Sequence, residues 1–180
     1  MLYENYKGES TKFTMCLELI ETLKENGKKV LLFSSFTSIF DSFIEEFNQR
    51  GIKYHMITGA VDKKKRKEEV DAFQSDDSDV FLISLKAGGT GLNLTKAQAV
   101  IHYDPWWNVS AQNQATDRAY RIGQTKNVLV YQLLMKNTIE AKIYEMQKRK
   151  KEMSDIFVEN SNGGISTLSK EELRDLFSME

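Results

Sequence analysis

The sequence predicts an α/β protein, with a doubly wound parallel sheet covered by helices on both faces. Helical and strand patterns alternate along most of the chain, as they do when crossover helices join parallel strands. Several apolar runs are short and continuous, which is typical of strands buried on both faces. The chain has 180 residues, 41% of them hydrophobic, which is enough for one substantial core.

Two helix–strand pairs are predicted in the first third of the chain. Residues 10–27 and 37–51 carry apolar side chains at helical spacing, and each segment ends on a glycine, a common helix terminator. The apolar run over residues 29–34 predicts the strand that follows the first helix. Residues 52–57 are interpreted as the strand that follows the second helix.

The same alternation continues through the middle of the chain. Residues 62–73 predict a helix with only two apolar side chains facing inward, and residues 79–84 and 99–104 predict two more buried strands. Ser110 is placed to open a further helix, and the run over residues 127–134 predicts the last strand.

The C-terminal part is predicted to be helical. Asn137 followed by Glu140 has the spacing of a capping box and predicts the start of a long helix, and a final short helix is expected over residues 169–177. These segments hold too few apolar residues to fold alone. We therefore expect one lobe over residues 1–136, with residues 137–180 packed on it as helices.

Composition limits the class of protein. The net charge of −1, from 25 basic and 26 acidic residues, says nothing about partners, although basic residues cluster at 62–69 and 148–151. The single cysteine, Cys16, excludes a disulfide framework and a cysteine-based metal site. No apolar run approaches the roughly 18 residues that span a bilayer. A cytoplasmic protein without membrane contact is expected.

Two candidate ligand segments follow predicted strands, where doubly wound sheets bind ligands. Residues 84–94, "SLKAGGTGLNL", contain three glycines that allow close backbone approach to an anion, although a tight structural turn explains them equally well. Residues 102–108, "HYDPWWN", place Trp106 and Trp107 at a proline turn. These tryptophans either pack on the core or stack on nucleic acid.

A third segment, "QATDRAYRIGQ", places Arg118 and Arg121 on one helix face, where both guanidinium groups can converge on one anion. The alternative is that Asp117 pairs with Arg121 and the cluster only covers a surface. With the glycines and tryptophans, the arginine pair favours polyphosphate and nucleic acid over a small neutral substrate. His55 and His102 lie in predicted strands and are expected to be structural, and no metal site is expected.

The order of these segments resembles the second RecA-like lobe of the Swi/Snf family, the DNA-translocating ATPases of helicase superfamily two. "VLLFSSFTSIFD" resembles the family's motif IV, and "ISLKAGGTGLNLTKAQAVIHYDPWWN" resembles motif V with its tryptophan extension. "QNQATDRAYRIGQTKNVLVYQLL" resembles motif VI, and the C-terminal segments are similar to the brace region. The resemblance covers nearly the whole chain and suggests a bacterial or archaeal member.

The resemblance implies a role for each matching residue. Arg118 and Arg121 would act as arginine fingers on the γ-phosphate of ATP, in a site completed by the N-terminal lobe of the same parent protein. The residues that would lie at the nucleotide are Gly91, Asn93 and Asp117. The residues that would contact DNA, largely through its backbone, are Ser34, Ser35, Arg66, Lys86, Ala87, Gly88, Gly89 and Trp107.

The resemblance also implies ATP with Mg²⁺ as cofactor, held mainly by the first lobe, and duplex DNA as partner. The 180 residues contain neither a P-loop nor an Asp-Glu box, so we expect this lobe alone to be a monomer that does not hydrolyse ATP. A nucleoid-associated location follows. Two alternatives remain: a non-catalytic ATPase-like module that binds DNA or a protein, and an α/β nucleotide- or sugar-binding enzyme that uses the glycine segment but leaves the arginine pair unexplained.

Overall fold

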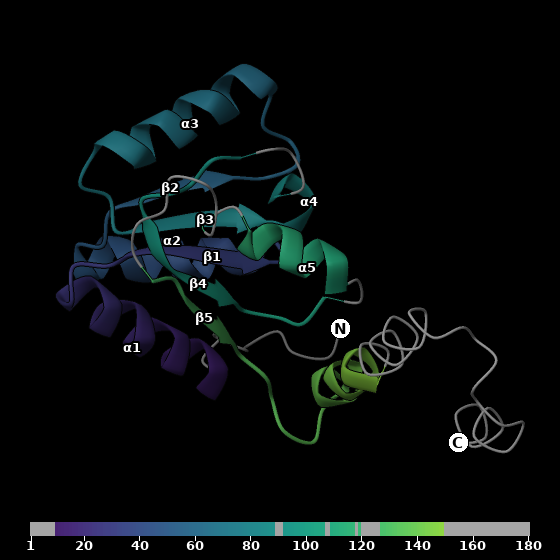
Figure 1. Cartoon of the computed structure of the whole chain (residues 1–180). Coiled ribbons are helices and arrows are strands. Elements are labelled where there is room, and N and C mark those ends of the chain that lie inside the picture. The colour runs from purple at the N-terminus through teal and green to yellow at the C-terminus, as the bar shows by residue number, and fades with distance from the viewer. Residues whose placement is uncertain (1–9, 89–91, 107–108, 118, 120–126, 150–180) are drawn as a thin grey trace, which may run out of the picture.

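The structure is a computed structural model that describes residues 10–88, 92–106, 109–117, 119 and 127–149. Five strands, all parallel, form one sheet in the order β2-β3-β1-β4-β5 (Figure 1). This topology, with helices between the strands, confirms the predicted RecA-like α/β class. The strands are β1 (Lys29–Ser34), β2 (Tyr54–Ile57), β3 (Val80–Ser84), β4 (Ala97–His102) and β5 (Leu129–Gln132).

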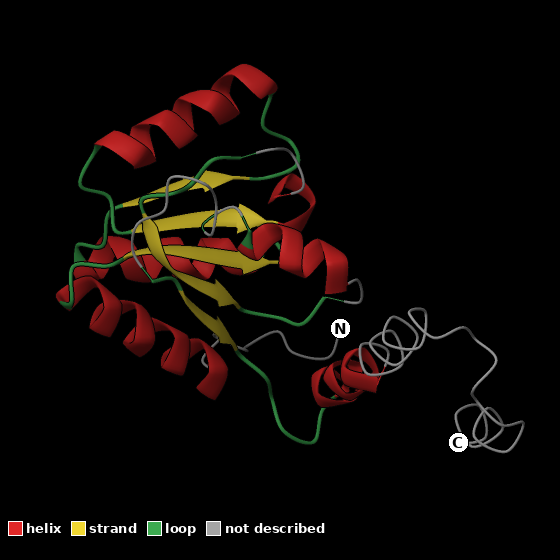
Figure 2. Cartoon of the chain, viewed as in Figure 1, coloured by secondary structure: helices red, strands yellow, loops and turns green. Residues whose placement is uncertain are grey.

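Helices cover both faces of this sheet, as Figure 2 shows. Those that connect or flank the strands are α1 (Thr11–Glu25), α2 (Ile39–Arg50), α3 (Lys63–Ser75), α4 (Leu85–Gly88) and α5 (Val109–Thr116). The short helix α4 differs from the expected glycine-rich turn. The helix begins directly after β3, and the Ala87 N–H donates to the Ser84 hydroxyl at 3.3 Å.

The ends of α1 and α2 agree with the glycine signals of the sequence. Ser10 accepts a hydrogen bond from the Phe13 N–H at 3.2 Å, which caps α1, and Gly27 follows the helix at φ +64°. Gly51 ends α2 at φ +61°, where a left-handed residue returns its N–H to the Phe47 carbonyl. Both glycines therefore occupy conformations that other residues rarely adopt.

Alternate strand residues build two separate cores, because both faces of the sheet are covered. Val30 and Leu32 of β1 point to the face under α1 and α2, whereas Leu31 and Phe33 point to the face under α3, α4 and α5. Cys16 of α1 lies in the first core with no exposed surface, and burial raises the pKa of its thiol to about 12. Its thiolate is therefore strongly disfavoured.

The described part of the C-terminal region is a helix over residues 139–149. The prediction that Asn137 and Glu140 form a capping box is wrong: Asn137 has φ +59°, and the Thr138 hydroxyl accepts the Glu140 N–H at 3.2 Å instead. The Glu140 carboxylate pairs with the nearly buried Lys12 of α1 at 2.7 Å. Within the described ranges, no helix combines the length and apolar character needed to cross a bilayer.

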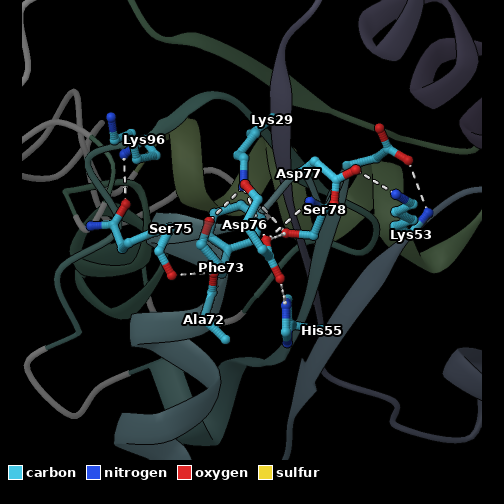
Figure 3. Close-up of polar contacts among 12 residues, drawn as sticks. Lys29, Lys53, His55, Ala72, Phe73, Ser75, Asp76, Asp77, Ser78 and Lys96 are labelled. Carbon is cyan, nitrogen blue, oxygen red and sulfur yellow. Dashed lines mark hydrogen bonds and ion pairs between the residues drawn. The ribbon is translucent and has the colours of Figure 1, made fainter.

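A polar network links the amino ends of the strands (Figure 3). Lys29 donates to the Phe73 and Asp76 carbonyls at the C-terminal end of α3, at 2.6 and 2.8 Å. Both ring nitrogens of His55 contact carboxylates, Nδ1 to Glu69 at 2.7 Å and Nε2 to Asp76 at 2.6 Å. Burial lowers the pKa of His55, but the hydrogen bonds to the two carboxylates outweigh burial, so the pKa rises above its ordinary 6.5.

We expect this histidine to make stability depend on pH. Its folded pKa is raised, so its contribution is fully present below about pH 6.5 and is lost as the pH rises through the folded pKa. His55→Gln should lower the free energy of unfolding by about 1–2 kcal/mol at pH 6 and by less at pH 9. Urea unfolding followed by circular dichroism measures both values.

The matched control for His55→Gln is Arg50→Ala, which removes an exposed ion pair whose charges do not change over this range. Its effect on the free energy of unfolding should be the same at pH 6 and pH 9. A His55→Gln effect that is equally independent of pH would contradict the assignment of a charged, doubly bonded imidazole.

Candidate nucleotide and nucleic-acid interface

The candidate site lies along the carboxyl edge of the sheet. Strands β1, β3 and β4 are neighbours and parallel, with Ser34 beside Ser84 and Phe33 beside His102. Their following segments therefore leave the sheet at the same edge, where proteins with doubly wound sheets bind ligands. This edge gathers segments that lie about 70 positions apart in the sequence.

The loop after β1, residues 35–38, is held by a carboxylate from the end of β4. The Ser34 hydroxyl donates to Asp104 Oδ1 at 2.6 Å, and the Ser35 N–H donates to Asp104 Oδ2 at 2.9 Å. Ser34 is fully buried, and Asp104 is 4% exposed. The Ser34 side chain therefore faces inward. The Ser35 hydroxyl oxygen is also buried, and it has no hydrogen-bond partner among the described residues.

Phe36 stands out from this loop with 68% of its surface exposed. Its N–H donates to the Ser34 hydroxyl at 3.1 Å, which fixes the backbone that carries the ring. A pocket of about 280 Å³ opens beside it. The pocket is lined by Ser34, Phe36, Ser38, Ile39, Tyr103, Asp104 and Glu140.

The segment after β3 contributes the backbone of α4 to the same edge. Ala87 is fully buried and packs in the core under α3 to α5, so its side chain is not available to a ligand. Lys86 and Gly88 lie in α4 between Leu85 and the end of the helix. Gly89 and Gly91 lie outside the described residues.

The turn after β4, residues 104–106, is held by two glutamines. The Trp106 N–H donates to Gln112 Oε1 at 3.3 Å, on α5, and the Trp106 carbonyl accepts a hydrogen bond from Gln147 of helix 139–149. Trp106 is partly buried against the second core, which is packing rather than exposure to a ligand. Trp107 lies outside the described residues.

Helix α5 is fixed to the end of β4 by a second contact. His102 Nε2 lies 2.9 Å from the Thr116 hydroxyl, which itself donates to the Gln112 carbonyl at 3.2 Å. Burial lowers the pKa of His102 to about 4, which favours the neutral ring, and its Nδ1 has no hydrogen-bond partner among the described residues. Asp117 is exposed just beyond the helix. Arg118 and Arg121 lie outside the described residues.

Two predicted site residues lie apart from the central loops. Arg66 is in the first turns of α3, where its guanidinium donates to the Val61 carbonyl at 3.1 Å, in the loop after β2. Asn93 is exposed, and its carbonyl accepts a hydrogen bond from Gln74 at 2.9 Å, near the C-terminal end of α3. Asn93 is thus next to the amino end of β4, away from Asp104, and its nucleotide role stays a prediction.

Sequence reasoning missed the residues that connect this edge. The sequence does not predict a role for Asp104, Gln112 or Gln147, although each forms a hydrogen bond with a segment that contains predicted site residues. An acidic residue directly after a buried strand is the one signal in the sequence that points to Asp104. In the part of the chain that is described, no group of three or more metal-ligating side chains occurs.

The sheet order, the buried strands and this polar carboxyl edge define a RecA-like lobe. Residues 11–123 match the model of the helicase conserved C-terminal domain, and the chain belongs to that family. The crystal structure of the C-terminal part of the Fun30 ATPase domain is similar, with a TM-score of 0.73 and 36% identity, over 76% of this chain and 45% of that one.

Curated relatives are much longer than this chain. An uncharacterized ATP-dependent helicase of Mycoplasma pneumoniae is 44% identical over 170 residues, which are 93% of this chain and 16% of the relative. The chromatin-remodeling ATPase INO80 of Candida albicans is 40% identical over 158 residues, 87% of this chain and 11% of the relative. The resemblance to the second lobe of an ATP-dependent helicase is therefore confirmed, and the chain spans about a sixth or less of these two relatives.

Proposed function

We propose that this chain is the C-terminal lobe of a Swi/Snf-type, ATP-dependent translocase on double-stranded DNA. In the intact parent, Arg118 and Arg121 reach the γ-phosphate of ATP, which the first lobe holds with Mg²⁺. Gly91, Asn93 and Asp117 are proposed nucleotide contacts. Arginine fingers stabilise the negative charge that spreads over the transferring phosphoryl group.

One observation carries this proposal: the loop after β1, α4 and the Trp106 turn lie together at the carboxyl edge of the sheet. The Trp106 turn also contacts α5, the helix that precedes the arginine pair in the sequence. A DNA strand running along this edge would meet backbone N–H groups and basic side chains, which bind phosphates without reading sequence. The proposed contacts are Ser34, Ser35, Arg66, Lys86, Ala87, Gly88, Gly89 and Trp107. Because the Ser34 side chain is buried, its contribution would be to position Ser35.

The decisive experiment measures ATP hydrolysis by the intact parent and by the 180-residue chain, each with and without duplex DNA. We expect DNA-stimulated hydrolysis by the parent and none above background by this chain, which contains no P-loop. Displacement of a third strand from a DNA triplex by the parent then tests translocation. Appreciable turnover by the isolated chain would contradict the split site, and a parent without ATPase activity would favour a binding module.

A further inference from the structure

Asp104 is buried in a way that needs explanation. It is 4% exposed, and no lysine or arginine of the described residues forms an ion pair with it. Removing a carboxylate from water is costly unless hydrogen bonds replace the lost solvation. Both of its oxygens are used in this way, one by the Ser34 hydroxyl and the other by the Ser35 N–H.

The loop that Asp104 holds has little other support. Phe36 is 68% exposed, and the pocket beside it separates the loop from helix 139–149 instead of filling the space with side chains. The loop's other hydrogen bonds are local. The Phe36 N–H donates to the Ser34 hydroxyl at 3.1 Å, and the Ile39 and Phe40 N–H groups donate to loop carbonyls at 3.3 and 3.1 Å. The two bonds to Asp104 therefore tie the end of β1 and the start of the loop to the segment that follows β4.

On its other side, Asp104 begins the turn that contacts α5. Two residues later the Trp106 N–H bonds to Gln112, and the Trp106 carbonyl is held by Gln147. Hydrogen bonds at the two ends of the short backbone segment 104–106 thus connect the loop after β1 with α5, the helix that precedes the arginine pair in the sequence.

We propose that Asp104 is a positioning residue, which holds the start of the loop after β1 against the end of β4 and so fixes the edge of the sheet along which DNA would run. The inference rests on the proposed function, because holding this loop in place affects DNA binding only if DNA binds at this edge of the sheet. Asp104 itself does not touch DNA, since a buried carboxylate would repel phosphate. It sets the spacing between the ends of β1 and β4 at this edge.

The test uses Asp104→Ala and Asp104→Asn in the intact parent. Alanine removes both acceptors, so the DNA concentration for half-maximal ATPase stimulation should rise at least about tenfold, while the KM for ATP changes less than about twofold. Asparagine can keep both contacts: its amide oxygen accepts the Ser35 N–H, and its N–H₂ donates to the Ser34 hydroxyl. The Ser34 hydroxyl can then donate its own proton to the Phe36 carbonyl, 3.3 Å away. Asparagine should restore most of the DNA response.

Asp79→Ala is the matched control. Asp79 also accepts a backbone N–H, from Lys53 at 2.8 Å, and pairs with Lys24 at 3.0 Å, but it lies at the opposite edge of the sheet. Its loss should lower the melting temperature without changing the DNA concentration for half-maximal stimulation. If Asp104→Ala does not fold, Ser34→Ala removes one of the two bonds and should raise that concentration by a smaller factor.

The two proposals fail differently. A wild-type parent whose ATPase ignores DNA overturns the proposed function and this inference together. The role of Asp104 alone is overturned if the wild-type parent responds to DNA and the Asp104→Ala parent shows the same response. It is also overturned if Asp104→Ala affects the response no more than Asp79→Ala does.

Discussion

Replacing Arg121 by alanine in the intact parent is expected to lower the turnover number for ATP by about 10³-fold or more, with DNA binding largely retained. The same result is expected for Arg118→Ala. Each guanidinium would stabilise charge that develops only in the transition state, so its loss should reduce kcat more than it raises the KM for ATP. Steady-state ATPase kinetics at saturating DNA, with DNA affinity measured by fluorescence anisotropy, separate the two effects.

The control for these variants is Arg50→Ala. Arg50 forms exposed ion pairs with Glu21 and Glu46 on the outside of α1 and α2, which contribute little to stability. Arg121→Lys adds a second comparison, because lysine keeps the charge but not the planar fork of donors. Turnover preserved in Arg118→Ala and Arg121→Ala, or lost only in proportion to DNA binding, would contradict the arginine-finger assignment.

Phe43→Ala is expected to lower the free energy of unfolding of the 180-residue chain by about 3–5 kcal/mol. Phe43 has no exposed surface, and its ring centroid lies 4.7, 5.7 and 5.4 Å from those of Phe13, Phe47 and Tyr103. Truncation removes buried apolar surface and leaves a cavity between α1, α2 and β4. Urea unfolding followed by circular dichroism measures the change.

Phe36→Ala serves as the matched comparison, because the same substitution there removes a ring that is 68% exposed. It should change the free energy of unfolding by less than about 0.5 kcal/mol. Equal losses in the two variants would mean that the cluster around Phe43 does not form the core between the sheet and its two helices.

The fold could be predicted from the sequence because local and global signals agree. Continuous apolar runs predict β1 and β3, because a strand buried on both faces does not alternate apolar and polar residues. Gly27 and Gly51 predict the helix ends because glycine readily adopts the positive φ found at both positions. The start of helix 139–149 was misplaced because Asn137 adopts a left-handed conformation, which passes the capping role to Thr138. Asparagine is common both as a helix N-cap and as a left-handed turn residue, so the sequence alone does not distinguish these two roles.

The candidate site was less predictable than the fold. Which segments lie at the carboxyl edge follows from strand order alone. The direction of a side chain does not follow from it. The family resemblance implies that Ser34 contacts DNA, but its hydroxyl donates inward to Asp104. That pairing joins residues 70 positions apart and depends on the register of two neighbouring strands, which no local pattern encodes.

The burial of Cys16 makes this lobe convenient for fluorescence work. It is the single thiol in the 180 residues, and its lack of exposure and raised pKa keep it from reacting with maleimide dyes. A cysteine introduced at exposed Glu25, at the C-terminal end of α1, would take up label selectively while the native sulfur stays untouched. A dye there would report the approach of a labelled companion lobe by energy transfer, without prior removal of the natural cysteine.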